Sequence, residues 1–176
     1  MKQEIEGLFL SSIVYADSSV IVQLFTQQHG RQSFIFKGVK KRNRPYIFQP
    51  FHFIDFLSVF NPEKNMNVGT NPTLVCPFYQ ITNDIRKTSV ALFITEVLSK
   101  FLKEGDYSEF LYHFLKNSII NFETNSFSSN FHLFFLIKLF PFLGIQPENN
   151  FSSSSCCFSI PDGKFIEASS TNVEKG

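Results

Sequence analysis

The first 77 residues alternate between apolar and polar positions with the short period of β-strands. In a strand, neighbouring side chains point to opposite faces, so residues of one parity build a core. Gly30 ends a turn between two of these runs, and Pro77 ends the pattern. Five strands are predicted, over residues 5–15, 18–26, 31–39, 48–60 and 66–75. This number of short strands is typical of the OB-fold, a five-stranded Greek-key barrel.

After Pro77 the apolar positions recur every three or four residues, which indicates helices. Thr82 or Asn83 is expected to cap the first helix, and Gly105 to end it. Three helices are predicted: one from residue 82 or 83 to about residue 104, one over 108–122, and one that follows residues 126–130 and ends at Gly144. The predicted fold class is therefore α+β, with an N-terminal five-stranded OB-fold barrel followed by an all-helical domain.

We predict three parts of the chain. Residues 1–77 form the barrel, residues 78–146 the helical domain, and residues 147–176 a tail. Residues 160–166 have the pattern of a hairpin, and the last ten residues are polar and expected to be disordered.

Charge is segregated along the chain, although the formal net charge is only +1. From Ser18 to Ile54 there is no Asp or Glu, whereas this stretch carries six cations: Arg31, Lys37, Lys40, Lys41, Arg42 and Arg44. Such a cluster beside aromatic rings attracts phosphates and offers ring faces to bases. The alternative is a solvated loop that keeps a strand edge soluble. Because the charge has one sign and follows an aromatic strand, we predict that these six residues bind nucleic acid.

Three aromatic residues near the cations are candidates for stacking on bases. Phe34 and Phe36 share one face of their strand, so both lie in the core or both are exposed. Core packing is the better interpretation for this pair. Tyr46, which follows Pro45 and the cations, is the predicted base-stacking residue.

No pattern in the sequence indicates catalysis or a cofactor. The four histidines are far apart, and neither a Gly-rich phosphate loop nor a nucleophile elbow occurs. The three cysteines, two of them adjacent, fit neither a disulfide framework nor a zinc site. We predict a non-enzymatic protein without metal or cofactor. The polar N-terminus and the lack of a 20-residue apolar stretch predict a cytoplasmic protein, not a membrane protein.

Two other function classes stay open at this point. An OB protein with this charge could bind RNA, since backbone neutralisation scarcely separates RNA from DNA. Alternatively the chain is a protein-interaction module, and its Phe-rich third helix exposes a groove for a peptide. Simple burial of that helix is the more direct explanation of its composition.

Several fragments, in their order and spacing, resemble RecO, the bacterial recombination mediator of DNA repair, in the form found in Bacteroidetes-type bacteria. The fragments, which together span residues 1–167, are GLFL at 7–10, YADSSVIV at 15–22, LFT at 24–26, GRQS at 30–33, KGVKK at 37–41, QP at 49–50, PFY at 77–79, DIRK at 84–87, NFHL at 130–133 and LG at 143–144.

The resemblance implies an OB-fold followed by a helical domain. It also implies binding of single- and double-stranded DNA, annealing of complementary strands, and a nucleoid-associated location. Family members load the RecA recombinase onto strands coated by single-strand binding protein (SSB), together with the partner RecR. They can take the acidic, apolar C-terminal tail of SSB into a pocket of the helical domain. Such a pocket needs a cation beside apolar side chains, and the candidates here are Arg86, Lys87, Lys100 and Lys138.

This sequence departs from the family pattern in two ways. Some members carry a four-cysteine zinc module, which three cysteines cannot supply, so zinc is not expected. The chain is also expected to stop before the helices that usually close the family's C-terminus.

Overall fold

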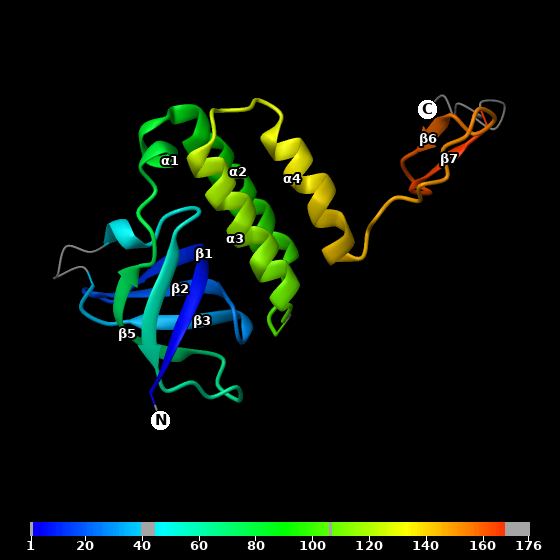
Figure 1. Ribbon diagram of the computed structural model, residues 1–176. Helices are drawn as coiled ribbons and strands as arrows, with labels where there is room; N and C mark the ends of the chain where they lie inside the picture. Colours follow the sequence, from blue (N-terminus) through cyan, green and yellow to red (C-terminus); the bar gives the residue numbers. More distant parts are fainter. Residues whose placement is uncertain (1, 40–44, 106, 168–176) are drawn as a thin grey trace. The chain divides into compact units, whose positions relative to one another are not determined.

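The computed structural model describes residues 2–39, 45–105 and 107–167. It contains two compact units, Met1–His132 and Leu133–Gly176. Figure 1 shows the first unit as a small barrel with helices along one side. Strands therefore occupy the first part of the described chain and helices the next, as the sequence predicts. Because the helices α1, α2 and α3 belong to the same compact unit as the barrel, the boundary at residue 77 separates types of secondary structure within one body.

The five predicted barrel strands are confirmed, with shorter third and fourth strands. The strands form a closed barrel in the order β1-β2-β3-β5-β4. All neighbours are antiparallel except β3 and β5, which pair in parallel over only three residue pairs. The strands are β1 (Gln3–Tyr15), β2 (Ser19–Thr26), β3 (Gly30–Phe36), β4 (Phe53–Ser58) and β5 (Asn67–Leu74).

Aromatic rings fill the barrel. Phe34 and Phe36 are both fully buried, which confirms that their shared face points inward. The Phe56 ring meets both edge-on, with centroids 4.7 and 5.2 Å away. Gly69 lies so close to Phe36 that a Cβ on this residue would stand 2.3 Å from a ring carbon. The parallel pairing of β3 with β5 therefore depends on glycine at this position.

The helical part begins earlier than predicted. A short helix α1 (Tyr79–Asn83) precedes α2 (Ile85–Phe101), and the N-cap of α2 is Asp84, whose carboxylate accepts from the Arg86 amide. The prediction of Thr82 or Asn83 as the cap was therefore wrong. Helix α3 (Glu109–Thr124) starts at its N-cap Ser108, as the sequence predicts.

The remaining elements are short. A 3-10 helix η1 (Pro45–Ile47) lies between β3 and β4, and α4 (Phe131–Leu139) continues into η2 (Phe140–Leu143), which ends at Gly144. The predicted hairpin is confirmed as β6 (Cys157–Ser159) and β7 (Lys164–Ile166). Helix α4 exposes Leu133, Phe134 and Ile137.

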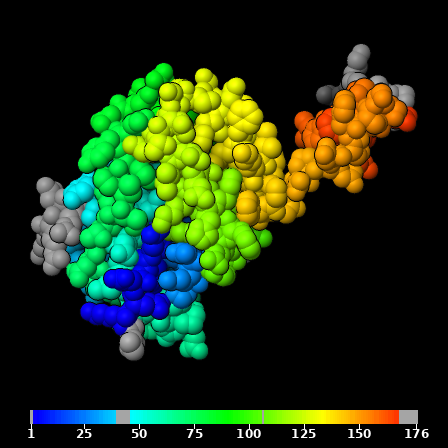
Figure 2. Space-filling model, viewed as in Figure 1, coloured from blue at the N-terminus to red at the C-terminus, as the bar shows by residue number. Residues whose placement is uncertain are grey.

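Helices α2 and α3 pack directly on the barrel, as the space-filling view shows (Figure 2). Tyr112 of α3 is 1% exposed, and its ring lies between Phe25 of β2 and Phe53 of β4, with centroids 6.2 and 6.0 Å away. Its hydroxyl donates to the Glu6 carboxylate of β1 at 2.6 Å, which also accepts from the Lys116 ammonium at 2.6 Å. The barrel and these helices are thus joined by apolar packing around one polar cluster.

Candidate nucleic-acid interface

Two buried apolar residues flank the segment that carries most of the predicted cations. Val39 and Ile47 are each 3% exposed and belong to the barrel core. Lys37, two residues before the first anchor, is exposed, and Tyr46, just before the second, is 55% exposed. Tyr46 is therefore available to stack on a base, and Lys37 to contact a phosphate. Both roles stay predictions.

Four of the predicted cations, Lys40, Lys41, Arg42 and Arg44, lie outside the described residues. In the sequence they lie between Val39 and Ile47, which are both buried in the barrel core. The segment also has no Asp or Glu to neutralise it.

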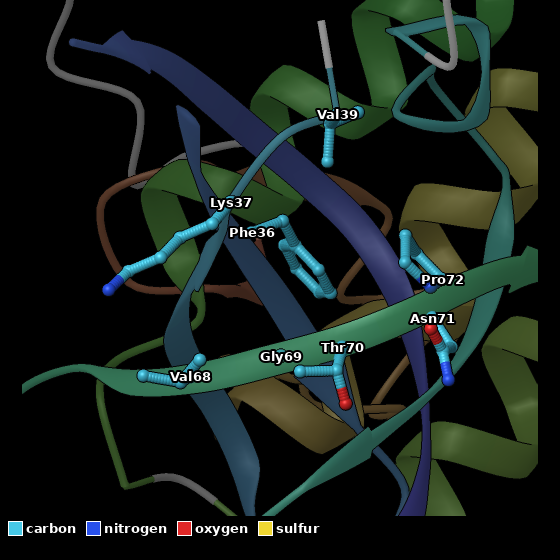
Figure 3. Close-up of a pocket in the computed structure, with 8 residues that line it drawn as sticks. All are labelled: Phe36, Lys37, Val39, Val68, Gly69, Thr70, Asn71 and Pro72. Carbon is cyan, nitrogen blue, oxygen red and sulfur yellow. The ribbon is translucent and has the colours of Figure 1, made fainter. Parts of the chain in front are cut away.

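A cavity of about 200 Å³ opens beside Lys37, where β3 ends and β5 continues (Figure 3). Its floor is the Phe36 ring against the β5 backbone at Gly69, and the Lys37 side chain extends away from this ring. Val39 lies on one side and Asn71 and Pro72 on the other. These residues include no carboxylate. The cavity is smaller than the roughly 300–1,000 Å³ of pockets that enclose drug-sized ligands, which favours a small planar group or a segment of an extended chain.

Acidic side chains lie on β1 and β4, and β4 is a direct neighbour of β5 in the barrel. Glu6 on β1 faces Asp55 on β4 across the strand pair, and Glu4 lies one step away on the same face. Burial, and then the neighbouring Glu4 carboxylate, raise the pKa of Asp55. Burial, and then the hydrogen bond to Glu6, raise the pKa of the Tyr112 hydroxyl. Glu6 lies against α3, where Tyr112 and Lys116 donate to it, whereas Asp55 pairs with Thr73 of β5, one residue beyond Pro72 of the cavity.

Arg31 does not belong to the exposed set in this structure. Its guanidinium donates to the Ser99 carbonyl at 2.7 Å, to the Leu102 carbonyl, and to the Gln23 side-chain oxygen at 2.6 Å. Ser99 and Leu102 lie at the C-terminal end of α2, where backbone carbonyls lack helical partners. The geometry therefore gives Arg31 the role of capping α2 and holding it to the barrel, and we leave it out of the proposed DNA surface.

Among the cations suggested for a partner tail, the three in the first compact unit, Arg86, Lys87 and Lys100, have different surroundings. Lys87 is 2% exposed, and its ammonium donates to Gln80 Oε1 and to three backbone carbonyls, those of Phe122, Glu123 and Asn125, at 2.6–3.0 Å. It caps the C-terminal end of α3 and is not accessible to a partner.

The other three candidates have separate surroundings. Arg86 pairs with Asp84 at 2.7 Å and stands over the Phe127 ring, 4.7 Å from its centroid. Lys100 pairs with Glu96 at 2.7 Å, fourteen residues further along α2 and so about 21 Å away at 1.5 Å per residue. Lys138 lies on α4. The prediction of a tail pocket stays untested. Arg86 is an exposed candidate that stands over an apolar ring, whereas Lys87, over the Phe122 ring, is buried.

Among residues 2–39, 45–105 and 107–167, no three His, Cys, Asp or Glu side chains gather in a way that could hold a metal ion. None of the helices in these ranges combines the length and apolar character needed to cross a bilayer.

Comparison with known proteins identifies the class to which this barrel and its helices belong. The family model "Recombination protein O N terminal" matches residues 1–76, and "Recombination protein O C terminal" matches residues 82–174. The boundary between the two matches coincides with the change from strands to helices.

Individual relatives agree with the family models. A "DNA repair protein RecO" from Phocaeicola vulgatus is 31% identical over 170 residues, which cover 94% of this chain and 70% of that protein. The protein of the same name from Bacteroides fragilis is 32% identical over 84% of this chain and 62% of its own length. That from Flavobacterium psychrophilum is 25% identical over 94% of this chain and 71% of its own length. The chain thus spans less than three quarters of these relatives.

The chain belongs to the recombination protein O family of DNA repair proteins. The resemblance noted from the sequence fragments is thereby confirmed.

Proposed function

We propose that this protein binds DNA through the side of the barrel that carries Lys37, the 40–44 segment and Tyr46, and that it anneals complementary single strands there. The observation that supports this most is the one-signed surface: exposed Lys37 and Tyr46 flank a segment with four more cations and no carboxylate. The membership of a DNA repair family makes DNA the first choice of nucleic acid.

Annealing on this surface needs no covalent step. Two strands repel each other through their phosphates, and Lys and Arg side chains that neutralise phosphates release counterions and remove this repulsion. Bases held by few specific contacts are free to pair with a second strand. Tyr46 offers a ring face that is tolerant of sequence, because every base can stack.

The partner interactions are further parts of the proposal. We propose that the protein acts with RecR and helps to load RecA onto strands coated by SSB. Its helical part takes the acidic SSB tail near Arg86, where a cation stands over the Phe127 ring. Arg86 pairs with the Asp84 carboxylate, so it would have to release Asp84 to bind a carboxylate of the tail.

The DNA proposal is tested with a charge-matched pair of variants. Replacing Lys40, Lys41 and Arg42 together by Ala should make the slope of log affinity for single strands against log salt shallower by about 2, at about 0.7 per phosphate contact. The control replaces Lys100, Lys138 and Lys164 by Ala, which removes the same charge elsewhere, and should keep the original slope. Equal slopes for the first variant and the unmodified protein would refute the proposed surface.

The same titration separates the alternative functions. Equal affinity for RNA and DNA of the same sequence would favour an RNA-binding OB protein. An absence of nucleic-acid binding, together with tight binding of the SSB tail peptide, would favour a protein-interaction module.

A further inference from the structure

The far half of β1 has a free edge. This strand pairs with β4 over residues 3–8, and its pairing with β2 shifts register after Phe9, which marks a bulge where β1 leaves β4. The Phe9 amide donates to the His52 carbonyl at 2.9 Å. Beyond this bond, residues 11–15 pair only with β2 among the residues that the structure describes. We call the other side of residues 11–15 the β1 edge, and its backbone N–H and C=O groups lack a neighbouring strand in the described part of the chain.

The side chains along the β1 edge are exposed and mostly apolar. Ile13, Val14 and Tyr15 are 66%, 64% and 52% exposed. Neighbouring strand residues point to opposite faces, so Val14 stands on one face of the edge and the other two on the opposite face. Val20, which pairs with Val14 from β2, is only 6% exposed. The exposure therefore belongs to the edge strand, and a further strand laid beside it would cover apolar side chains on both faces.

Charge neither blocks this edge nor attracts a charged partner to it. Residues 7–30, which hold the β1 edge and all of β2, include one formally charged side chain, Asp17. Edge strands that avoid pairing usually carry Lys, another charged residue or Pro, whereas residues 11–15 have the sequence SSIVY. The partner that complements the β1 edge is therefore an extended strand without charge.

The same segment of a second copy meets this description. An antiparallel pair about a two-fold axis matches one surface with itself. With the axis at Ile13, the middle of the segment, all five residues pair; Ile13 then faces itself, and each of the other apolar side chains faces a serine. The two Asp17 carboxylates lie eight residues apart, about 27 Å at about 3.4 Å per residue, which is well beyond the screening length of about 8–10 Å. The pairing thus brings no like charges together.

From these observations we infer that the β1 edge pairs antiparallel with the β1 edge of a second copy, with Ile13 of the two copies at the centre. The contact spans five residues, about 17 Å. A contact of this length buries less than the roughly 1,200–2,000 Å² of a stable interface, so we expect a weak dimer with a Kd on the order of 100 μM. This inference goes beyond the proposed function and does not depend on DNA binding.

Sedimentation velocity without nucleic acid tests the dimer. Between about 10 μM and about 1 mM, the sedimentation coefficient of the unmodified protein should rise from the monomer value towards the dimer value. Val14→Lys puts a cation on the edge, beside a second copy with the same charge, and should weaken association by at least about tenfold. The matched control is Val59→Lys, at a valine that is 59% exposed and lies outside the strands, and it should associate like the unmodified protein. Circular dichroism confirms that each variant is folded.

Disulfide trapping tests the register of the pairing. In a background where Ser replaces the three native cysteines, Ile13→Cys places two thiols opposite each other, with Cα atoms about 4.5–5.5 Å apart, which is within the range of a disulfide. Tyr15→Cys is the control, because the two introduced thiols would lie four residues apart, about 14 Å. Mild oxidation should therefore link the Ile13→Cys protein into dimers and leave the Tyr15→Cys protein unlinked.

Three results would overturn the inference. They are a monomer at every concentration, equal association of the Val14→Lys and Val59→Lys variants, and equal cross-linking of the two cysteine variants. If the protein is monomeric and an added synthetic peptide of residues 9–17 shifts the NMR signals of residues 11–15, the edge binds a peptide partner instead of a second copy.

Discussion

Replacing Arg31 by Met tests whether this residue holds α2 to the barrel or contacts DNA. The guanidinium donates three hydrogen bonds, two of them to backbone carbonyls at the end of α2. Hydrogen bonds from charged groups contribute about 1.5–3 kcal/mol each. Arg31 is only partly buried, so water replaces some of these bonds, and its Nε has no partner among the residues that the structure describes. We therefore expect the free energy of unfolding to fall by about 2–4 kcal/mol.

Urea unfolding followed by circular dichroism at 222 nm measures this loss. The matched control is Lys37→Met, an exposed cation six residues further along, which should change stability by less than about 0.5 kcal/mol. DNA binding should show the opposite pattern. Arg31→Met should keep the salt slope at temperatures where it is folded, and Lys37→Met should make it shallower by about 0.7. An Arg31 variant with unchanged stability and a shallower slope would reverse the assignment.

Two further predictions concern buried ionisable groups. Lys87→Met should lower the free energy of unfolding by about 3–5 kcal/mol, because it leaves buried carbonyls at the end of α3 without a donor. The control is Lys100→Met, on the same helix but exposed. It should lower the free energy of unfolding by less than about 0.5 kcal/mol in the same urea titration. Burial lowers the pKa of His52 below its ordinary 6.5, so the unfolded chain binds more protons and stability should fall as pH drops through 6.5. His52→Asn, which can still donate to the Ile47 carbonyl as Nδ1 does, should reduce this fall between pH 7.5 and 5.5; an identical pH profile would contradict the reasoning.

The barrel was predictable because its determinants are local. Alternation along each strand assigned Phe34 and Phe36 to the same face, and the structure buries both. The predicted fourth strand began too early at Phe48. The chain is not extended before Phe53, because Phe51 has a positive φ of 65°.

The helix boundaries depended on partners distant in sequence. The Glu123 carboxylate accepts from the amides of Gln80 and Ile81, which supports α1 and moves the cap of α2 to Asp84. No feature within residues 78–85 reveals this contact. Phe110, an apolar residue in the first turn of α3, is 83% exposed.

The candidate site divides in the same way. A run of cations is visible in sequence, but the role of an individual cation depends on what lies opposite to it. Arg31 and Lys87 both meet carbonyls at helix ends that are far from them in the chain, about 70 and 35 residues away.

The salt dependence of single-strand binding by the unmodified protein tests the central claim most directly. Fluorescence anisotropy of a labelled poly-dT oligonucleotide, titrated between 50 and 300 mM salt, measures it. Contacts from Lys37, Lys40, Lys41, Arg42 and Arg44 predict a slope of log affinity against log salt near −3.5. A slope between zero and about −1 would contradict a polyanion-binding barrel face.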